Sequence, residues 1–122
     1  MFYIINTPVL TDYGYWAFNG PLTASEAIAL LNTNYVSALG HTGSAQYLFK
    51  RLGIKIPVNR IQITMQPGDE ALIVWLKDHP PEGSVLSAEA MELFSPELAL
   101  LRCIKHPQIS AANLVRQAEA GR

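Results

Sequence analysis

The first candidate for chemistry is the segment 37–45, which reads Ser-Ala-Leu-Gly-His-Thr-Gly-Ser-Ala. The first residues of this segment are expected to end a short strand, which Gly40 breaks. A helix is expected from His41 to Leu52. The first turn of a helix carries unpaired amides and a positive dipole end, which suit a phosphate. A histidine placed there can exchange a proton near neutral pH. The pattern therefore favours a phosphate-handling site at His41, although His41 could instead simply cap the helix.

Small and hydroxyl residues around His41 are the expected ligand contacts. Gly40 and Gly43 would let a ligand approach the backbone, because neither carries a side chain. Thr42 and Ser44 could donate hydrogen bonds from their hydroxyl groups.

Arg60 is the second candidate, because it interrupts an otherwise apolar stretch directly after Asn59. A guanidinium that faces a cleft can clamp a phosphate with two parallel hydrogen bonds. The alternative is a solvated arginine on an outer face of the sheet.

A third group lies in the loop predicted from Asp78 to Gly83, which holds His79 and Glu82. Glu82 could orient a histidine or accept a hydrogen bond from a ligand hydroxyl. Both residues could equally be ordinary exposed loop charges.

The sequence offers no recognisable metal site or cofactor motif. Three histidines and one cysteine stand without metal-ligand spacing, and no phosphate-binding loop, nucleophile elbow or dinucleotide fingerprint is present. Cys103 lies in an apolar run, which is typical of a small core residue. We therefore expect neither a metal ion nor a cofactor.

The elements that must position these residues alternate between strand and helix patterns. Strands are expected at 2–6, 13–18, 35–39, 59–65, 70–77 and 98–104, and helices at 23–32, 41–52, 87–94 and 110–120. Thr23 and Glu26 form a capping-box pattern. Ile61 and Ile63 alternate with polar residues, so 59–65 and 70–77 are expected to form a hairpin around the turn Pro67-Gly68-Asp69.

The pattern of apolar residues predicts which helix faces are buried. In the first helix these are Ala27, Ile28, Leu30 and Leu31, and in the second they are Ala45, Leu48, Phe49 and Leu52. The predicted fold is a single α+β domain over 1–105, with a mixed, mainly antiparallel sheet flanked by helices. A helical extension is expected over 106–122.

Length and charge restrict the function. The 122 residues are 49% hydrophobic, enough for one domain with a core, and the formal net charge is -1. A protein that binds long nucleic acid non-specifically normally carries a clear basic excess, so that class is disfavoured. No window approaches ~18 apolar residues and the start lacks a basic stretch, so we expect neither a membrane span nor a signal peptide, but a cytoplasmic protein.

Several segments occur in an order that is familiar from one protein family. They are Tyr3-Ile-Ile-Asn-Thr7, Ser37-Ala-Leu-Gly-His41, Pro57-Val-Asn-Arg-Ile-Gln-Ile63, Pro67-Gly-Asp-Glu-Ala-Leu72 and Pro81-Glu-Gly-Ser-Val-Leu86. Together, over roughly residues 2–104, they resemble the viral ring nucleases, anti-CRISPR proteins of archaeal viruses that also occur in bacteria and phages. The Gly-His and Asn-Arg motifs are specific in combination, although each is weak alone.

The resemblance implies a homodimer that binds one ring of cyclic tetra-adenylate across its twofold axis and shuts off type III CRISPR signalling. The ribose 2′-hydroxyl would attack phosphorus, and His41 would protonate the departing 5′-oxygen as general acid. The product would be linear di-adenylate with a 2′,3′-cyclic phosphate, formed without metal because the nucleophile is already in the substrate. Arg60 would stabilise phosphate charge, Glu82 would support catalysis, and Asn6 would line the pocket.

The sequence departs from this family at two positions. The family loop usually has a basic residue, commonly arginine, where this chain has His79, and family members carry a serine near Val9. These differences would weaken the grip on the ring. A binding protein that sequesters a cyclic oligonucleotide without cutting it is therefore the alternative from a different functional class.

Overall fold

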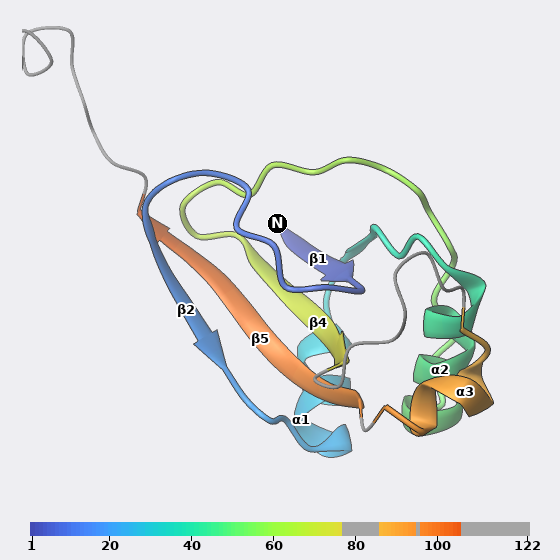
Figure 1. The fold of residues 1–122 in the computed structure, drawn as a ribbon. Coiled ribbons are helices and arrows are strands. Elements are labelled where there is room, and N and C mark those ends of the chain that lie inside the picture. The colour runs from blue at the N-terminus through green and yellow to red at the C-terminus, as the bar shows by residue number, and fades with distance from the viewer. Residues whose placement is uncertain (77–85, 95, 106–122) are drawn as a thin grey trace, which may run out of the picture.

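The computed structural model describes residues 1–76, 86–94 and 96–105 of the chain (Figure 1). In chain order the elements are β1 (Phe2–Ile5), β2 (Tyr15–Asn19), α1 (Ala24–Leu31), β3 (Val36–Ser37), α2 (Thr42–Leu52), β4 (Glu70–Leu76), α3 (Ala88–Glu92) and β5 (Pro96–Lys105). The described residues form a single α+β domain, as the sequence predicts. No helix within these ranges is long and apolar enough to cross a membrane.

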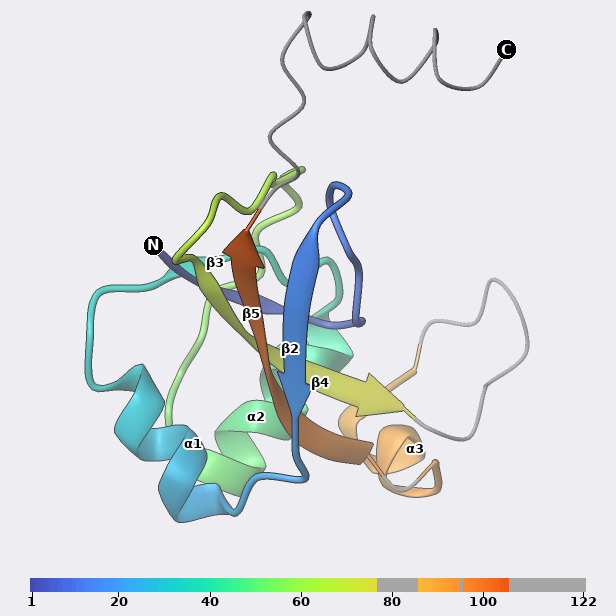
Figure 2. The same cartoon turned by 90° about the vertical axis from the view of Figure 1, so that its left-hand side faces the viewer.

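The strands form one mixed sheet in the order β2-β5-β4-β1-β3 (Figure 2). β1 pairs in parallel with both β3 and β4, whereas β5 pairs antiparallel with both β2 and β4. The prediction of a mixed sheet is confirmed: among the described strands, two pairs are parallel and two are antiparallel, and the antiparallel pairs contain more of the matched residues. The change from parallel to antiparallel pairing falls at β4, which lies between β1 and β5.

The prediction of a strand over 59–65 is wrong. These residues are irregular, and they form no hairpin with β4, because β1 and β5 already occupy both edges of β4. The alternation reflects partial packing instead: Met65 is buried and Ile63 is half-buried against the second face of the sheet, but Ile61 is exposed. Figure 1 shows this stretch as part of the long connection from α2 to β4.

The core has two parts, one on each face of the sheet. On the first face, α1 and α2 cover apolar side chains of the strands; the fully buried members include Ile4, Leu72, Leu48 and Val74. On the second face, Met65 from the 59–69 connection packs with a set that includes Ile73, Leu101 and Cys103, and Ile63 and Trp16 lie against this set. Cys103 is a free, buried core residue, and burial raises the pKa of its thiol.

Helix starts follow the sequence closely. At α1 the Thr23 hydroxyl accepts from the Glu26 amide at 3.1 Å, and the Glu26 carboxylate accepts from the Thr23 amide at 3.0 Å, which confirms the capping box. Hydrogen bonding of the Glu26 carboxylate with the backbone and side chain of Thr23 lowers the pKa of Glu26. At α3 the Ser87 hydroxyl accepts from the Ala90 amide at 3.2 Å.

Two predictions about helix faces fail. Ile28 is 42% exposed and Phe49 is 55% exposed, although both were expected to be buried. In α2 the buried position is instead taken by Tyr47, which packs with Leu48 and Leu52. The predicted loop with His79 and Glu82 and the extension over 106–122 lie outside the described residues.

Candidate functional site

The candidate site forms at the carboxyl ends of the parallel strands β1 and β3. In β1 and β3, Tyr3 pairs with Val36 and Ile4 with Ser37, so both strands run toward the same edge. Asn6 follows β1 directly, and Gly40 and His41 follow β3. Sites at the carboxyl ends of parallel strands are the rule in open sheets that contain them, because the loops there converge.

His41 is the N-cap residue of α2, with an extended backbone (φ -136°, ψ 137°). Its side chain makes no cap hydrogen bond, and Nδ1 is buried without a partner. A buried polar atom left unpaired costs about 1–3 kcal/mol, so its presence calls for an explanation. The side chain of His41 therefore does not form the hydrogen bond that a simple helix cap would make.

Arg60 reaches this helix start from a distant part of the chain. Its Nε donates a hydrogen bond to the Gly40 carbonyl oxygen at 2.7 Å, one residue before His41. The guanidinium makes no ion pair within the described ranges, and the side chain is exposed. The structure thus brings Arg60 to the start of α2, although Arg60 lies 20 positions after Gly40 in the sequence.

Asn59 and its neighbours hold Arg60 in place. The Asn59 amide donates to the Leu39 carbonyl at 2.8 Å, and its side-chain Nδ2 donates to the Ser37 carbonyl at 2.8 Å. The Ser37 hydroxyl in turn donates to the Pro57 carbonyl at 2.5 Å. The segment 57–60 therefore follows the end of β3 closely. The role of Ser37 has no signature in the sequence, because a serine at a strand end is too common.

The small residues of this helix start differ in what they offer a ligand. Thr42 is exposed, whereas Ser44 is buried, so the hydroxyl of Thr42 is the more open of the two. A Cβ at Gly43 would lie 1.8 Å from the Leu86 carbonyl oxygen, whereas a Cβ at Gly40 would have nothing nearer than Arg60 Cγ at 4.0 Å. The space beside Gly43 is therefore filled by the chain itself, while Gly40 leaves room for a ligand.

A hollow lies next to the site, at the end of β1. It has a volume of about 360 Å³, and its lining is Ile5, Val9, Leu10, Thr11, Gln62, Ile63 and Thr64. Ile5 directly precedes Asn6, the residues from 9 to 11 follow Asn6 within five positions, and the residues from 62 to 64 follow Arg60 within four. The hollow therefore adjoins the segments that carry both candidate residues, and Val9 is part of its wall.

The residues described by the structure contain no group of three or more His, Cys, Asp or Glu side chains that could hold a metal ion. Glu82 and His79 cannot be placed, since they lie outside the described ranges. Their described flanks can be: Leu76 ends β4, which is parallel to β1, and Leu86 packs against Gly43.

Comparison with known proteins identifies the family. A model of the STIV B116-like family matches residues 2–98. Uncharacterized protein 26 of Sulfolobus islandicus filamentous virus is 33% identical over 111 residues, which covers 87% of this chain and 94% of that protein. The chain belongs to the STIV B116-like family.

Other proteins that are similar to this STIV B116-like chain are also viral. Uncharacterized protein ORF117 of Acidianus two-tailed virus is 43% identical over 63 residues, which span about half of each protein (52% of this chain and 54% of ORF117). The solved structure of B116 of Sulfolobus turreted icosahedral virus superimposes with a TM-score of 0.62 at 18% identity, covering 83% of this chain and 97% of that one. The shared fold is thereby established, and the expected kinship with archaeal viral proteins is confirmed.

Proposed function

We propose that this STIV B116-like chain is a metal-independent ring nuclease that cleaves cyclic tetra-adenylate and so shuts off type III CRISPR signalling. The observation that carries the proposal is the pairing at the start of α2: an uncapped His41 next to an Arg60 that is fixed by the Gly40 carbonyl. A proton donor, a cation and a helix N-terminus are a sufficient set for cleaving a phosphodiester.

The reaction needs no nucleophile from the protein. A ribose 2′-hydroxyl of the ring attacks the adjacent phosphorus, the bond from phosphorus to the 5′-oxygen breaks, and the 2′-hydroxyl proton leaves to solvent. His41 protonates the departing 5′-oxygen; because Nδ1 is buried, Nε2 is the ring nitrogen assigned to this transfer. Two such cuts yield linear di-adenylate with 2′,3′-cyclic phosphate ends.

Charge that develops on the phosphate oxygens is stabilised by two groups. Arg60 uses Nε on the Gly40 carbonyl, which leaves its two terminal nitrogens for the phosphate. The amides at the start of α2 provide the second group, and Gly40 leaves the backbone open on that side. Asn6, Thr42 and Ser44 are assigned to ring binding.

Glu82 and His79 complete the proposed site. The described flanks of their segment support this assignment, since Leu76 ends β4 at the same edge as β1 and Leu86 lies against Gly43. We assign Glu82 a supporting role in catalysis and His79 a weak contact with the ring.

A homodimer is part of the proposal. A ring with four equivalent phosphates presents equal groups to two sites related by a twofold axis, and a C2 dimer supplies two copies of His41 and Arg60. The partners are therefore a second copy of the chain and the cyclic tetra-adenylate, in the cytoplasm of the cell that makes the ring.

A protein that stores the ring without cutting it is the second candidate. The observation in its favour is that no described group hydrogen-bonds His41 Nδ1 to orient the imidazole, and general acids are usually oriented in this way. One experiment separates the two. The purified protein is incubated in excess over radiolabelled cyclic tetra-adenylate, and products are separated by chromatography. Linear di-adenylate with a 2′,3′-cyclic phosphate supports the nuclease, and ring recovered intact from a stable complex supports storage.

A further inference from the structure

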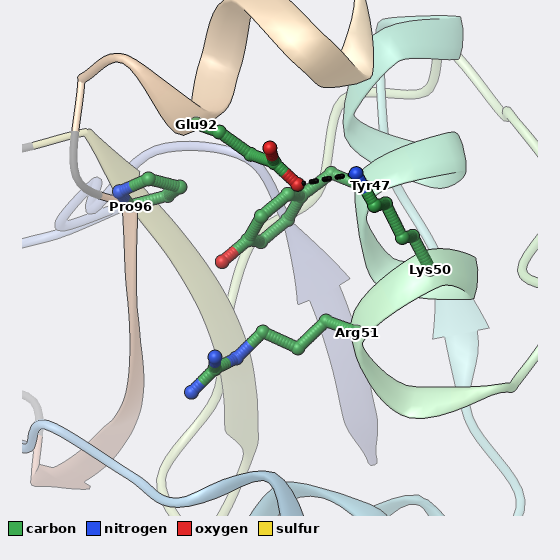
Figure 3. A pocket seen from close by; sticks show the side chains of 5 residues that line it. All are labelled: Tyr47, Lys50, Arg51, Glu92 and Pro96. Carbon is green, nitrogen blue, oxygen red and sulfur yellow. Dashed lines mark ion pairs between the residues drawn. The ribbon is translucent and has the colours of Figure 1, made fainter.

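A second cavity lies on α2, toward the opposite end from His41. Its volume is about 390 Å³, and its lining is Tyr47, Lys50 and Arg51 from α2, Glu92 from α3 and Pro96 from β5 (Figure 3). A helix rises 1.5 Å per residue, so this lining begins about 10 Å along the axis from His41. The volume falls in the range of small-molecule sites. The proposed ring-nuclease chemistry makes no use of it.

Tyr47 has a buried ring and places its hydroxyl in this cavity. The residue is only 5% exposed, and its hydroxyl forms no hydrogen bond with another described residue. Figure 3 shows the hydroxyl directed away from α2 into the space between Pro96 and Arg51. Burial raises the pKa of the phenol, an effect that Arg51 partly opposes. The hydroxyl is therefore neutral at physiological pH and can donate a hydrogen bond.

Arg51 supplies a cation to the same space. Its guanidinium lies on the side of the cavity to which the Tyr47 hydroxyl points (Figure 3). It forms no ion pair or hydrogen bond with any residue that the structure describes. A fork of N–H donors beside a phenol O–H is an arrangement that binds an oxyanion.

The other charges of the lining neutralise each other. Lys50 Nζ lies 2.8 Å from a Glu92 carboxylate oxygen, and this pair raises the pKa of Lys50. The ion pair joins α2 to α3 and removes the carboxylate as a source of repulsion for an anion. One positive charge, that of Arg51, remains in the lining.

The position of Lys50 and Arg51 in the last turn of α2 has an ordinary cause as well. Cations stabilise the negative end of a helix dipole. That effect explains their presence but not the direction of the Tyr47 hydroxyl, which points into the space that Arg51 borders. The Tyr47 hydroxyl is the independent observation that indicates a ligand.

We propose that this cavity binds a small organic anion. Its phosphate or carboxylate group lies between the Arg51 guanidinium and the Tyr47 hydroxyl, and its body rests against Pro96. Pro96 begins β5 and Glu92 ends α3, so the ligand would contact all three elements that border the cavity. Phosphate and carboxylate share the chemistry that this pair recognises, and the choice between them is made by experiment.

The test is a titration of the whole protein followed by ¹H–¹⁵N NMR, with inorganic phosphate, adenosine monophosphate, citrate and adenosine as separate probes. At least one anion is expected to shift the amide signals of Tyr47, Lys50 and Arg51 in a saturable way, whereas uncharged adenosine is not. A response to phosphate and adenosine monophosphate identifies a phosphate site, and a response to citrate alone identifies a carboxylate site. The absence of a saturable shift at these amides with every anion would overturn the proposal.

Matched variants locate the binding groups. Arg51→Ala is expected to weaken anion binding about tenfold or more, and Tyr47→Phe, which keeps the ring but loses the hydroxyl, several-fold. Lys55→Ala removes an equal charge from the surface beyond this helix and should leave the affinity unchanged. Equal losses in Lys55→Ala and Arg51→Ala, or unchanged affinity in both cavity variants, would contradict the assignment.

The helix start at His41 is itself a place where an anion could bind, so it needs a separate control. In Arg60→Ala the shifts at Tyr47 and Arg51 should persist with the same affinity. Their disappearance in this variant would mean that the anion binds at the start of α2 and that the second cavity binds nothing.

Discussion

At the scale of single residues, the hydrogen bonding of His41 conflicts with the stability of the start of α2 in two ways. His41 occupies the N-cap of α2, where asparagine, aspartate or serine would accept a hydrogen bond from the first turn, yet it makes no such bond. Its Nδ1 is buried without a partner. A residue that lowers local stability in this way is expected where function requires it.

This conflict predicts that His41→Asn trades activity for stability. The asparagine oxygen can accept from the amide of Gly43 or Ser44, so the free energy of unfolding should rise by about 0.5–1 kcal/mol. Ring cleavage should be lost, because asparagine cannot donate a proton as an acid. Chemical denaturation and a single-turnover assay measure the two effects, with Thr42→Asn, one position later, as the control for stability alone, because Thr42 is assigned to ring binding. A variant that is less stable than wild type would show that the imidazole already supports the helix start.

The two glycines next to His41 provide a second pair of variants. Gly43→Ala places a Cβ 1.8 Å from the Leu86 carbonyl oxygen, so the backbone before α3 must move, and a loss of about 1–3 kcal/mol in stability is expected. Gly40→Ala meets nothing closer than 4.0 Å and should leave stability within about 0.5 kcal/mol of wild type. Thermal unfolding compares the two, and equal effects would contradict the packing of Leu86 on α2.

The residues at this site were only partly predictable from the sequence. The change from strand to glycine to histidine to helix indicated His41, because each step has a local signature. The contact between Arg60 and Gly40 had no such signature, since it depends on how 57–60 folds back onto β3. The hydrogen bonds of Ser37 and Asn59 are of the same long-range kind and were missed.

At the scale of elements, the segment 57–60 acts as a support for the end of β3. Asn59 is central to it, because its backbone and side chain bond to two carbonyls of the β3 strand end. Asn59→Ala leaves the Ser37 carbonyl unpaired and should cost about 1 kcal/mol of stability.

The same variant should also slow cleavage, because Arg60 would lose its fixed position. The expected pattern is a lower rate at saturating enzyme with a smaller change in ring affinity. Gln62→Ala serves as the stability control, since Gln62 is exposed and forms no hydrogen bond with another described residue. Wild-type stability and rate in Asn59→Ala would exclude this segment as a support.

The elements show why local patterns succeed in one place and fail in another. The capping box at Thr23, the start of the helix expected from position 87 and the apolar run of β5 are set by neighbours in the sequence, and all three predictions are confirmed. The strand expected over 59–65 fails because its pattern needs a free strand edge, and β1 and β5 occupy both edges of β4. A pairing partner that far away leaves no trace in the local sequence.

At the scale of the whole molecule, the proposed function requires two sites around one ring. The protein should therefore run as a dimer of about twice its 13.4 kDa chain mass in size-exclusion chromatography with light scattering. Addition of cyclic tetra-adenylate to the His41→Ala variant should stabilise that dimer, because the ring contacts both copies. A monomer that binds one ring per chain would contradict the shared site.

The central claim is tested most directly by single-turnover cleavage of radiolabelled cyclic tetra-adenylate in excess EDTA, with wild-type protein and with His41→Ala. The wild type should convert the ring to linear di-adenylate with 2′,3′-cyclic phosphate ends despite the chelator. His41→Ala should be slower by about 10²–10⁴-fold, the usual contribution of a positioned acid, while it still binds the ring. Equal rates in the two proteins, or activity that disappears in EDTA and returns with magnesium or manganese, would contradict the account.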